Sequence, residues 1–77
     1  MKYIIFEDDS AILFSEGLDH KAMAKNSPVK SAGFCIIETY RNSFDDIRAR
    51  VSCYGESISL GVKSNEGDDK IIKGLWF

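Results

Sequence analysis

The residues best suited to chemistry are two cysteines and a histidine. Cys35, Cys53 and His20 are the only residues of their types in the 77-residue chain. A tetrahedral zinc site needs four ligands, and a catalytic histidine needs a nucleophile and an orienting acid. Asp19 precedes His20, but adjacent residues on a helix point in different directions. We therefore expect no metal site and no catalytic residue, with a solvated histidine and two buried thiols that act as small hydrophobes.

Acidic residues gather in three places that resemble metal sites at first sight. None of these groups has the spacing of a calcium-binding loop. Two fall in expected turns and one at an expected helix start, where turn chemistry and the helix dipole account for acidic side chains. The groups are Glu7-Asp8-Asp9, Asp45-Asp46, and Glu66 with Asp68 and Asp69. The sequence gives no reason to expect a cofactor.

The stretch from Ser31 to Lys63 must position any functional surface, and it predicts three antiparallel strands. Tyr54-Gly55-Glu56-Ser57 is typical of a two-residue hairpin turn. Folding there pairs Cys53 with Ile58, Val51 with Leu60, Ala49 with Val62, Ser52 with Ser59, Arg50 with Gly61 and Arg48 with Lys63. One face of this hairpin is then apolar and the other polar, as in a half-buried antiparallel sheet.

A second hairpin precedes this one, with turn-forming residues from Asn42 to Asp46. It places Cys35 opposite Cys53, Ile37 opposite Val51 and Glu38 opposite Arg50, which would form a pair of opposite charges. Both hairpins predict the same buried set: Cys35, Ile37, Ala49, Val51, Cys53, Ile58, Leu60 and Val62. Agreement between two hairpins supports a real sheet.

The other face of this sheet should carry aromatic rings and guanidinium groups with little acid. Its members are Phe34, Ile36, Tyr40, Arg48, Arg50, Ser52, Tyr54 and Ser59. Tyrosine and arginine are enriched where proteins bind one another. We predict that a partner is bound by Phe34, Tyr40, Arg48, Arg50, Ser52 and Tyr54. The alternative is that the cross-strand pairs Phe34–Tyr54 and Glu38–Arg50 only stabilise a solvated face.

The remaining elements complete an α+β domain. Lys2–Phe6 and Ala11–Phe14 should form an opening hairpin around Glu7–Ser10, with Ile5 opposite Ile12 and Tyr3 near Phe14. Both faces of that hairpin are apolar, so it should lie centrally in the sheet or be covered on its second side. A short helix is expected over Leu18–Asn26, ended by Pro28, with a strand starting at Val29.

The final helix should begin near Ser64 and carry an apolar stripe of Ile71, Ile72, Leu75 and Trp76. We expect this helix to pack on the apolar face of the sheet. Ala32-Gly33, inside a strand, indicates a bulge or a close backbone approach. The predicted fold is a single α+β domain over residues 1–77 in the order β-β-α-β-β-β-α.

Composition narrows the possible functions. The formal net charge of −2 disfavours non-specific binding to nucleic acid or an anionic membrane. No run of residues is long and apolar enough to span a bilayer, and Met1-Lys2-Tyr3 lacks signal-peptide anatomy. With two cysteines and no disulfide framework, we expect a cytoplasmic protein in a reducing compartment.

The segments Val29–Cys35 and Tyr54–Gly61, followed by an acidic helix start, resemble small uncharacterised proteins encoded by bacteriophages and prophages. The likeness extends from the first hairpin to the last helix. It implies a mobile-element origin, but no known activity and no functional residue. Small phage proteins of this kind often bind and block a host component, including immune systems. That implication is an association rather than a physical argument.

Three hypotheses about the function follow. The leading hypothesis is a small non-enzymatic protein that occupies a host protein, such as a defence-system component, through the aromatic and arginine face, alone or as a homodimer. The first alternative is a module that sequesters a nucleotide-like molecule, stacked on Phe34 or Tyr54 with phosphate contacts from Arg48 and Arg50. The second is a structural homodimer without a separate partner.

Overall fold

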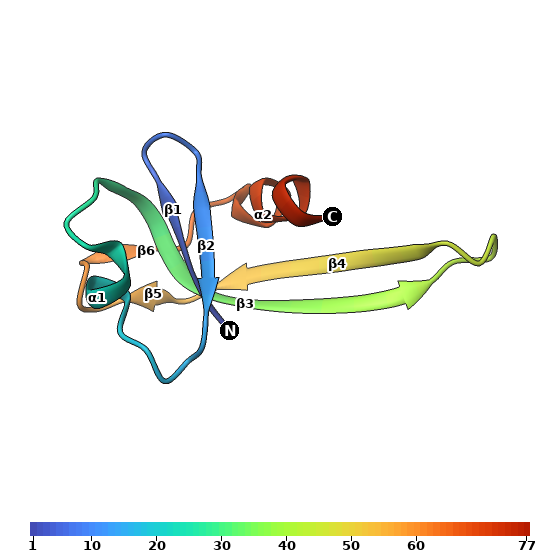
Figure 1. The fold of residues 1–77 in the computed structure, drawn as a ribbon, viewed down its shortest axis with the longest axis horizontal. Coiled ribbons are helices and arrows are strands. Elements are labelled where there is room, and N and C mark those ends of the chain that lie inside the picture. Colours follow the sequence, from blue (N-terminus) through green and yellow to red (C-terminus); the bar gives the residue numbers. More distant parts are fainter.

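A computed structural model describes all 77 residues and shows a small α+β fold (Figure 1). The elements are β1 Lys2–Phe6, β2 Ala11–Phe14, α1 His20–Ala24, β3 Val29–Arg41, β4 Ile47–Tyr54, β5 Glu56–Ser57, β6 Val62–Lys63 and α2 Asp68–Trp76. Strands β1 to β4 form one antiparallel sheet in the order β2-β1-β3-β4, while β5 and β6 form a separate two-stranded sheet. The fold class is confirmed, with one strand more than predicted.

The opening hairpin has its predicted strands but a different register. Ile4, not Ile5, lies opposite Ile12, and Lys2 lies opposite Phe14. The turn is one residue tighter than predicted, because the Phe6 amide donates to the Ser10 carbonyl at 2.8 Å. The tighter turn requires a left-handed residue, which is Asp9 at φ 66°. The expectation that this hairpin lies centrally is correct for β1, which pairs with β2 on one side and β3 on the other.

Strands β3 and β4 form a long hairpin that projects from the body of the molecule, and we call its outer half the arm (Figure 1). The predicted register is confirmed, with Cys35 opposite Cys53, Ile37 opposite Val51 and Glu38 opposite Arg50. At the tip, Asn42 Oδ1 accepts hydrogen bonds from the amides of Phe44 and Asp46. The loop closes through Asp45 at φ 64°, which gives the three-residue turn common in hairpins.

The predicted hairpin around Gly55 is wrong. Gly55 does have the positive φ that such a turn needs, at 79°, but the chain turns back only between Ser57 and Gly61. The pairing of Val51 with Leu60 and of Ala49 with Val62 is therefore absent. Instead, β5 pairs with β6 at the end of the molecule opposite the arm (Figure 1).

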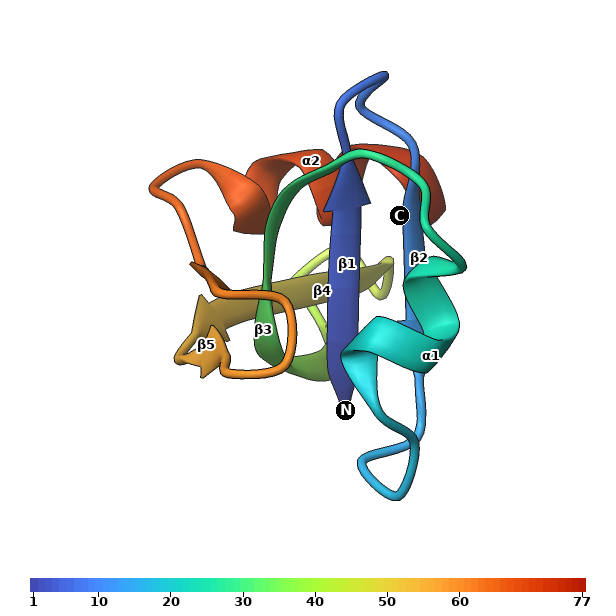
Figure 2. The same cartoon turned by 90° about the vertical axis from the view of Figure 1, so that its left-hand side faces the viewer.

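The reason for this difference is that the sheet has two apolar faces, and each needs a cover. On one face, Tyr3, Ile5, Cys35 and Val51 pack with Ile72 of α2. On the other face, a second cluster consists of Ile4, Phe14, Ala24 and Ala32, with Leu60 and Val62 packed against it. Figure 2 views the molecule from the end opposite the arm and shows α1 and the β5–β6 segment at that end. Leu60 and Val62 are partly buried there, and this contact removes apolar surface of the second cluster from water.

Both helices are shorter than predicted. Leu18 and Asn26 lie outside α1, and α2 begins at Asp68 rather than near Ser64. The α2 helix packs against β4 as expected, and Ile72 is fully buried. Leu75 and Trp76 of the predicted apolar stripe are instead exposed. Neither helix combines the length and the hydrophobicity needed to cross a membrane.

Candidate functional site

The candidate site is the face of the β3–β4 hairpin that points away from α2, which we call the outer face. It consists of Phe34, Ile36, Glu38, Tyr40, Arg48, Arg50, Ser52 and Tyr54. All of these residues except Phe34 are exposed, and Ile36, Tyr40 and Tyr54 are between 45% and 49% exposed. Half-exposed large side chains on one strand pair form a surface that a partner can contact.

Alternation along the two strands places these side chains on one face, but they separate into two groups. Tyr40, Arg48 and Arg50 lie on the arm, and Phe34 and Tyr54 lie at its base. The distance from Arg50 to Tyr54 along the strand is roughly 13 Å at about 3.3 Å per residue. Ser52 lies between the groups, opposite Ile36. Ser59, which we also expected here, is in the turn between β5 and β6.

The two arginines differ in their surroundings. Arg48 lies 3.7 Å from the Asp46 carboxylate in an exposed ion pair, which is a weak contribution to stability. Arg50 lies opposite Glu38 as predicted but forms no ion pair with it; its guanidinium lies 5.5 Å from the centroid of the Tyr40 ring. A guanidinium stacked on a ring keeps its donors free for another acceptor. Arg50 and Tyr40 therefore form one ready-made recognition pair.

At the base of the arm, the Phe34 and Tyr54 rings are stacked with their centroids 5.8 Å apart. Two glycines permit this arrangement. A β-carbon on Gly33 would lie 2.5 Å from the Tyr54 carbonyl oxygen, and one on Gly55 would lie 2.9 Å from the Phe34 ring. The prediction of a close backbone approach at Gly33 is thus confirmed.

A groove of about 620 Å³ opens beside the stacked rings, and we call it the base groove. Lys2 from β1 lies on one side, with its ammonium 5.9 Å from the centroid of the Phe34 ring. Ile58, in the β5–β6 turn, lies at the groove and is 88% exposed. The prediction that Ile58 is buried is wrong, because it depended on the hairpin that does not form. Lys2 was missed because its position depends on the pairing of β1 with β3, which sequence alternation does not reveal.

His20 also lines the base groove, but it is buried rather than solvated as predicted. Its Nε2 lies 2.9 Å from the Gly33 carbonyl oxygen. A carbonyl can only accept a hydrogen bond, so Nε2 carries the proton and donates. The ring also makes edge-on contacts with Phe14 and Phe34 at 5.4 and 6.0 Å. His20 therefore holds the base of the aromatic stack and is not placed as a catalytic base.

The two cysteines lie on the opposite, α2-facing side of the hairpin as free thiols. Burial raises the pKa of Cys53 to about 12 and also raises the pKa of Cys35. Thiols held in the protonated form are poor nucleophiles and poor metal ligands. No three of the chain's histidine, cysteine and acidic side chains lie close enough together to hold a metal ion.

A buried hydrogen bond beneath the cysteines fixes α2 on the sheet. The Tyr3 hydroxyl donates to Asp68 Oδ2 at 2.6 Å, and the Asn65 amide donates to the same oxygen at 2.9 Å. Burial, reinforced by this carboxylate, raises the pKa of Tyr3 above its ordinary value. Asp68 therefore serves as a structural acceptor between α2 and the sheet, a role beyond the expected interaction with the helix dipole.

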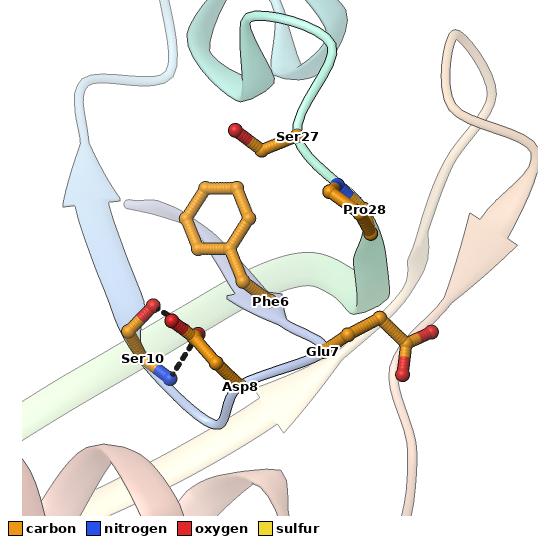
Figure 3. Close-up of a pocket in the computed structure, with 6 residues that line it drawn as sticks. All are labelled: Phe6, Glu7, Asp8, Ser10, Ser27 and Pro28. Carbon is orange, nitrogen blue, oxygen red and sulfur yellow. Dashed lines mark hydrogen bonds between the residues drawn. The ribbon is translucent and has the colours of Figure 1, made fainter.

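Another hollow, of about 380 Å³, lies beside the β1–β2 turn (Figure 3). Of its two acidic residues, Glu7 and Asp8, the latter accepts hydrogen bonds at Oδ1 from the hydroxyl and amide of Ser10. These bonds lower the pKa of Asp8, the hydroxyl contributing most. The geometry is that of a local turn, in which Asp8 already has its partners. We therefore place the candidate site on the outer face and not here.

Comparison with family models, with curated proteins and with solved structures found no match to this chain. The candidate site therefore depends on its own geometry and chemistry.

Proposed function

We propose that this chain is a small non-enzymatic binding protein that covers a site on a partner protein with its outer face. The observation that supports this most is the exposure of three large side chains, Ile36, Tyr40 and Tyr54, on one face of the β3–β4 hairpin. An isolated two-stranded hairpin is only marginally stable in water, so an arm of this length gains most when a partner covers it.

The composition of the outer face also favours a protein partner. Tyrosine and arginine are the residues that most often dominate binding energy at protein interfaces. Tyr40 and Arg50 provide one such pair, and Tyr54 stacked on Phe34 provides a rigid ring at the other end. Ile58 extends this surface beyond the base groove. In line with the resemblance to phage proteins, we propose that the partner is a host protein.

Sequestration of a nucleotide-like molecule receives less support. The stacking rings and the arginines proposed to hold its phosphates are in different groups, roughly 13 Å apart along β4. The acidic residues Asp19 and Glu56 also line the base groove and would repel a phosphate there. A thermal-shift screen with nucleotides at millimolar concentration tests this alternative directly.

The test of the proposal replaces one residue from each group of the outer face, as Arg50→Ser with Tyr54→Ala. Both side chains are exposed, so the fold should remain intact. We expect the double variant to lose a host protein that the unmodified chain captures from lysate, with a weakening of more than about 100-fold. Lys25→Ala, which removes an exposed cation beside α1, is the matched control and should capture as the unmodified chain does.

Two measurements complete the test. Circular dichroism and unfolding curves should show that the double variant keeps its fold. Equal capture of the same host proteins by both forms would contradict the proposal. If the unmodified chain has the mass of a dimer in solution and the double variant that of a monomer, the outer face serves self-association instead.

A further inference from the structure

Strand β4 is the edge of the main sheet, and its outward backbone groups have no partners in the chain. The Asn42 amide bonds to the Asp46 carbonyl, and hydrogen-bonded pairs alternate with non-bonded pairs along an antiparallel ladder. By this alternation, Arg48 and Arg50 bond to β3, while Ile47, Ala49 and Val51 direct their N–H and C=O groups outward. None of these three makes a backbone hydrogen bond outside the β3–β4 ladder.

Helix α2 lies beside β4 (Figure 1). Together with the strand edge it lines a groove of about 280 Å³. Ala49 and Val51 line the strand side of the groove, and Lys70 and Lys73 line the helix side. Past the end of α2 the edge continues along the arm, where Ile47 is exposed. The edge is thus bounded by a helix over part of its length and open over the rest, as in sites that bind an added strand.

The charges around this groove are mainly positive. Arg50, Lys70 and Lys73 border it, against a single acid, Asp69. None of these three cations takes part in any of the four ion pairs of the chain. Unpaired cations beside unpaired backbone groups favour a ligand that carries carboxylates and is itself extended.

We propose that the edge of β4 binds an extended acidic segment of a partner protein, which adds to the main sheet as a fifth strand beside α2. Backbone hydrogen bonds to Ile47, Ala49 and Val51 provide affinity, and Lys70 and Lys73 select acidic side chains. A second copy of β4 fits this edge less well, because it would bring Arg48 and Arg50 of two strands together. The groove shares Tyr40 and Arg50 with the outer face, whereas Phe34 and Tyr54 at the base of the arm do not line it.

The experiment uses the full chain and a synthetic peptide of about ten residues in which glutamate and valine alternate. Titration followed by amide NMR should give saturable binding. Hydrogen exchange at the Ile47, Ala49 and Val51 amides should slow when the peptide is bound, while the amides of Arg48 and Arg50 change less. The same peptide with lysine in place of glutamate should bind at least about tenfold more weakly.

The variant Lys70→Glu with Lys73→Glu should weaken acidic-peptide binding at least about tenfold. The matched control, Lys21→Glu with Lys25→Glu, reverses two exposed charges at α1 and should leave binding unchanged. Added salt should weaken binding to the unmodified chain, which tests the charge argument even if the variant does not fold. Tyr54→Ala should retain peptide binding, so this site and the outer face are tested separately.

Three results would overturn the proposal. The first is no protection of the three outward amides at millimolar acidic peptide. The second is equal binding of the acidic and lysine peptides. The third is protection of those amides without peptide that increases with protein concentration, because the occupant of the edge would then be a second copy.

Discussion

Ser31 and Ser57 are both buried, yet only one of them has a hydrogen-bond partner. The Ser31 hydroxyl, on the fully buried part of β3, has none. The Ser57 hydroxyl accepts a hydrogen bond from the Leu60 amide at 3.3 Å and lies 3.4 Å from the Ser59 hydroxyl. A buried polar group without a partner loses its hydration and gains nothing in return.

We therefore predict opposite effects of the same substitution at these two positions. Ser31→Ala should raise the free energy of unfolding by about 1 kcal/mol, and Ser57→Ala should lower it by about 1 kcal/mol. Urea unfolding of both variants beside the unmodified chain measures the difference. A loss of stability in both variants would contradict the assignment of Ser31 as unpaired.

At the same scale, residue type predicted the environment of some side chains and not of others. The cysteines were expected to be buried thiols because a small apolar side chain on the aliphatic face of a strand pair has few alternatives. His20 was expected in solvent because its partner, the Gly33 carbonyl, belongs to a different element. A hydrogen bond between residues distant in sequence leaves no pattern in the sequence near either residue.

At the scale of elements, the stability of the arm depends on its turn, because neither helix covers the part of the arm nearest the tip. Asn42 holds the turn's backbone, since its Oδ1 accepts from two amides, while exposed Arg41 donates to Asp45. Its neighbour Ser43 is exposed, and its side chain makes no hydrogen bond in the turn. Substitution of Asn42 should therefore lower the stability of the arm, whereas substitution of Ser43 should not.

The corresponding prediction is that Asn42→Ala loosens the arm while the body keeps its stability. The loss of about 1–2 kcal/mol should speed hydrogen exchange of the Tyr40 and Arg48 amides by about tenfold or more. Exchange in β1 should not change. Ser43→Ala is the control and should leave both regions as they are. An equal increase of the hydrogen-exchange rates in the arm and in the body would show that the arm does not open separately.

An element could be predicted from the sequence where apolar and polar residues alternate within that element alone. The β3–β4 register followed from two runs in which small and aliphatic residues alternate with aromatic and charged ones. The segment after Gly55 was not predictable in this way, because two placements of Leu60 and Val62 satisfy the same pattern. The choice between them depends on the second apolar face of β1, which α1 alone does not cover. The predicted burial of the last turn of α2 was wrong for a similar reason. An apolar stripe on a helix does not reveal which of its residues the sheet covers.

At the scale of the whole molecule, the arm makes the chain elongated. The radius of gyration is 13.0 Å, compared with about 11.5 Å for a compact domain of this length. The accessible surface is 5165 Å², compared with about 4,700 Å² expected from its mass. The excess is surface that a partner can cover, which agrees with the proposed binding role.

Three groups, of which Tyr3 and Cys35 are buried and Cys53 is partly buried, make the stability of the whole molecule depend on alkaline pH. The pKa values of Tyr3, Cys35 and Cys53 are all raised by burial in the folded state. The unfolded chain releases these protons at lower pH than the folded chain does. The resulting stability is therefore fully present below the unfolded thiol pKa of about 9 and is lost as pH rises toward the folded values.

We predict a loss of roughly 1–2 kcal/mol in the free energy of unfolding between about pH 7.5 and about pH 10.5. Urea unfolding in the presence of a reducing agent measures it. Cys53→Ala should lower stability at neutral pH by removing a packed side chain, but it should also make the loss in alkali smaller. An unchanged pH dependence in this variant would show that the Cys53 thiol does not contribute.

The half-exposed end of α2 has a practical consequence. Trp76, the only tryptophan of the chain, is on the last turn of α2, three residues after Lys73 and so on the same side of the helix. A ligand that binds along the edge of β4 and reaches the last turn of α2 should shield this indole and shift its fluorescence emission to the blue. A protein bound only to the outer face would leave the emission unchanged. The chain thus carries an intrinsic optical probe that reports which of its two surfaces is occupied.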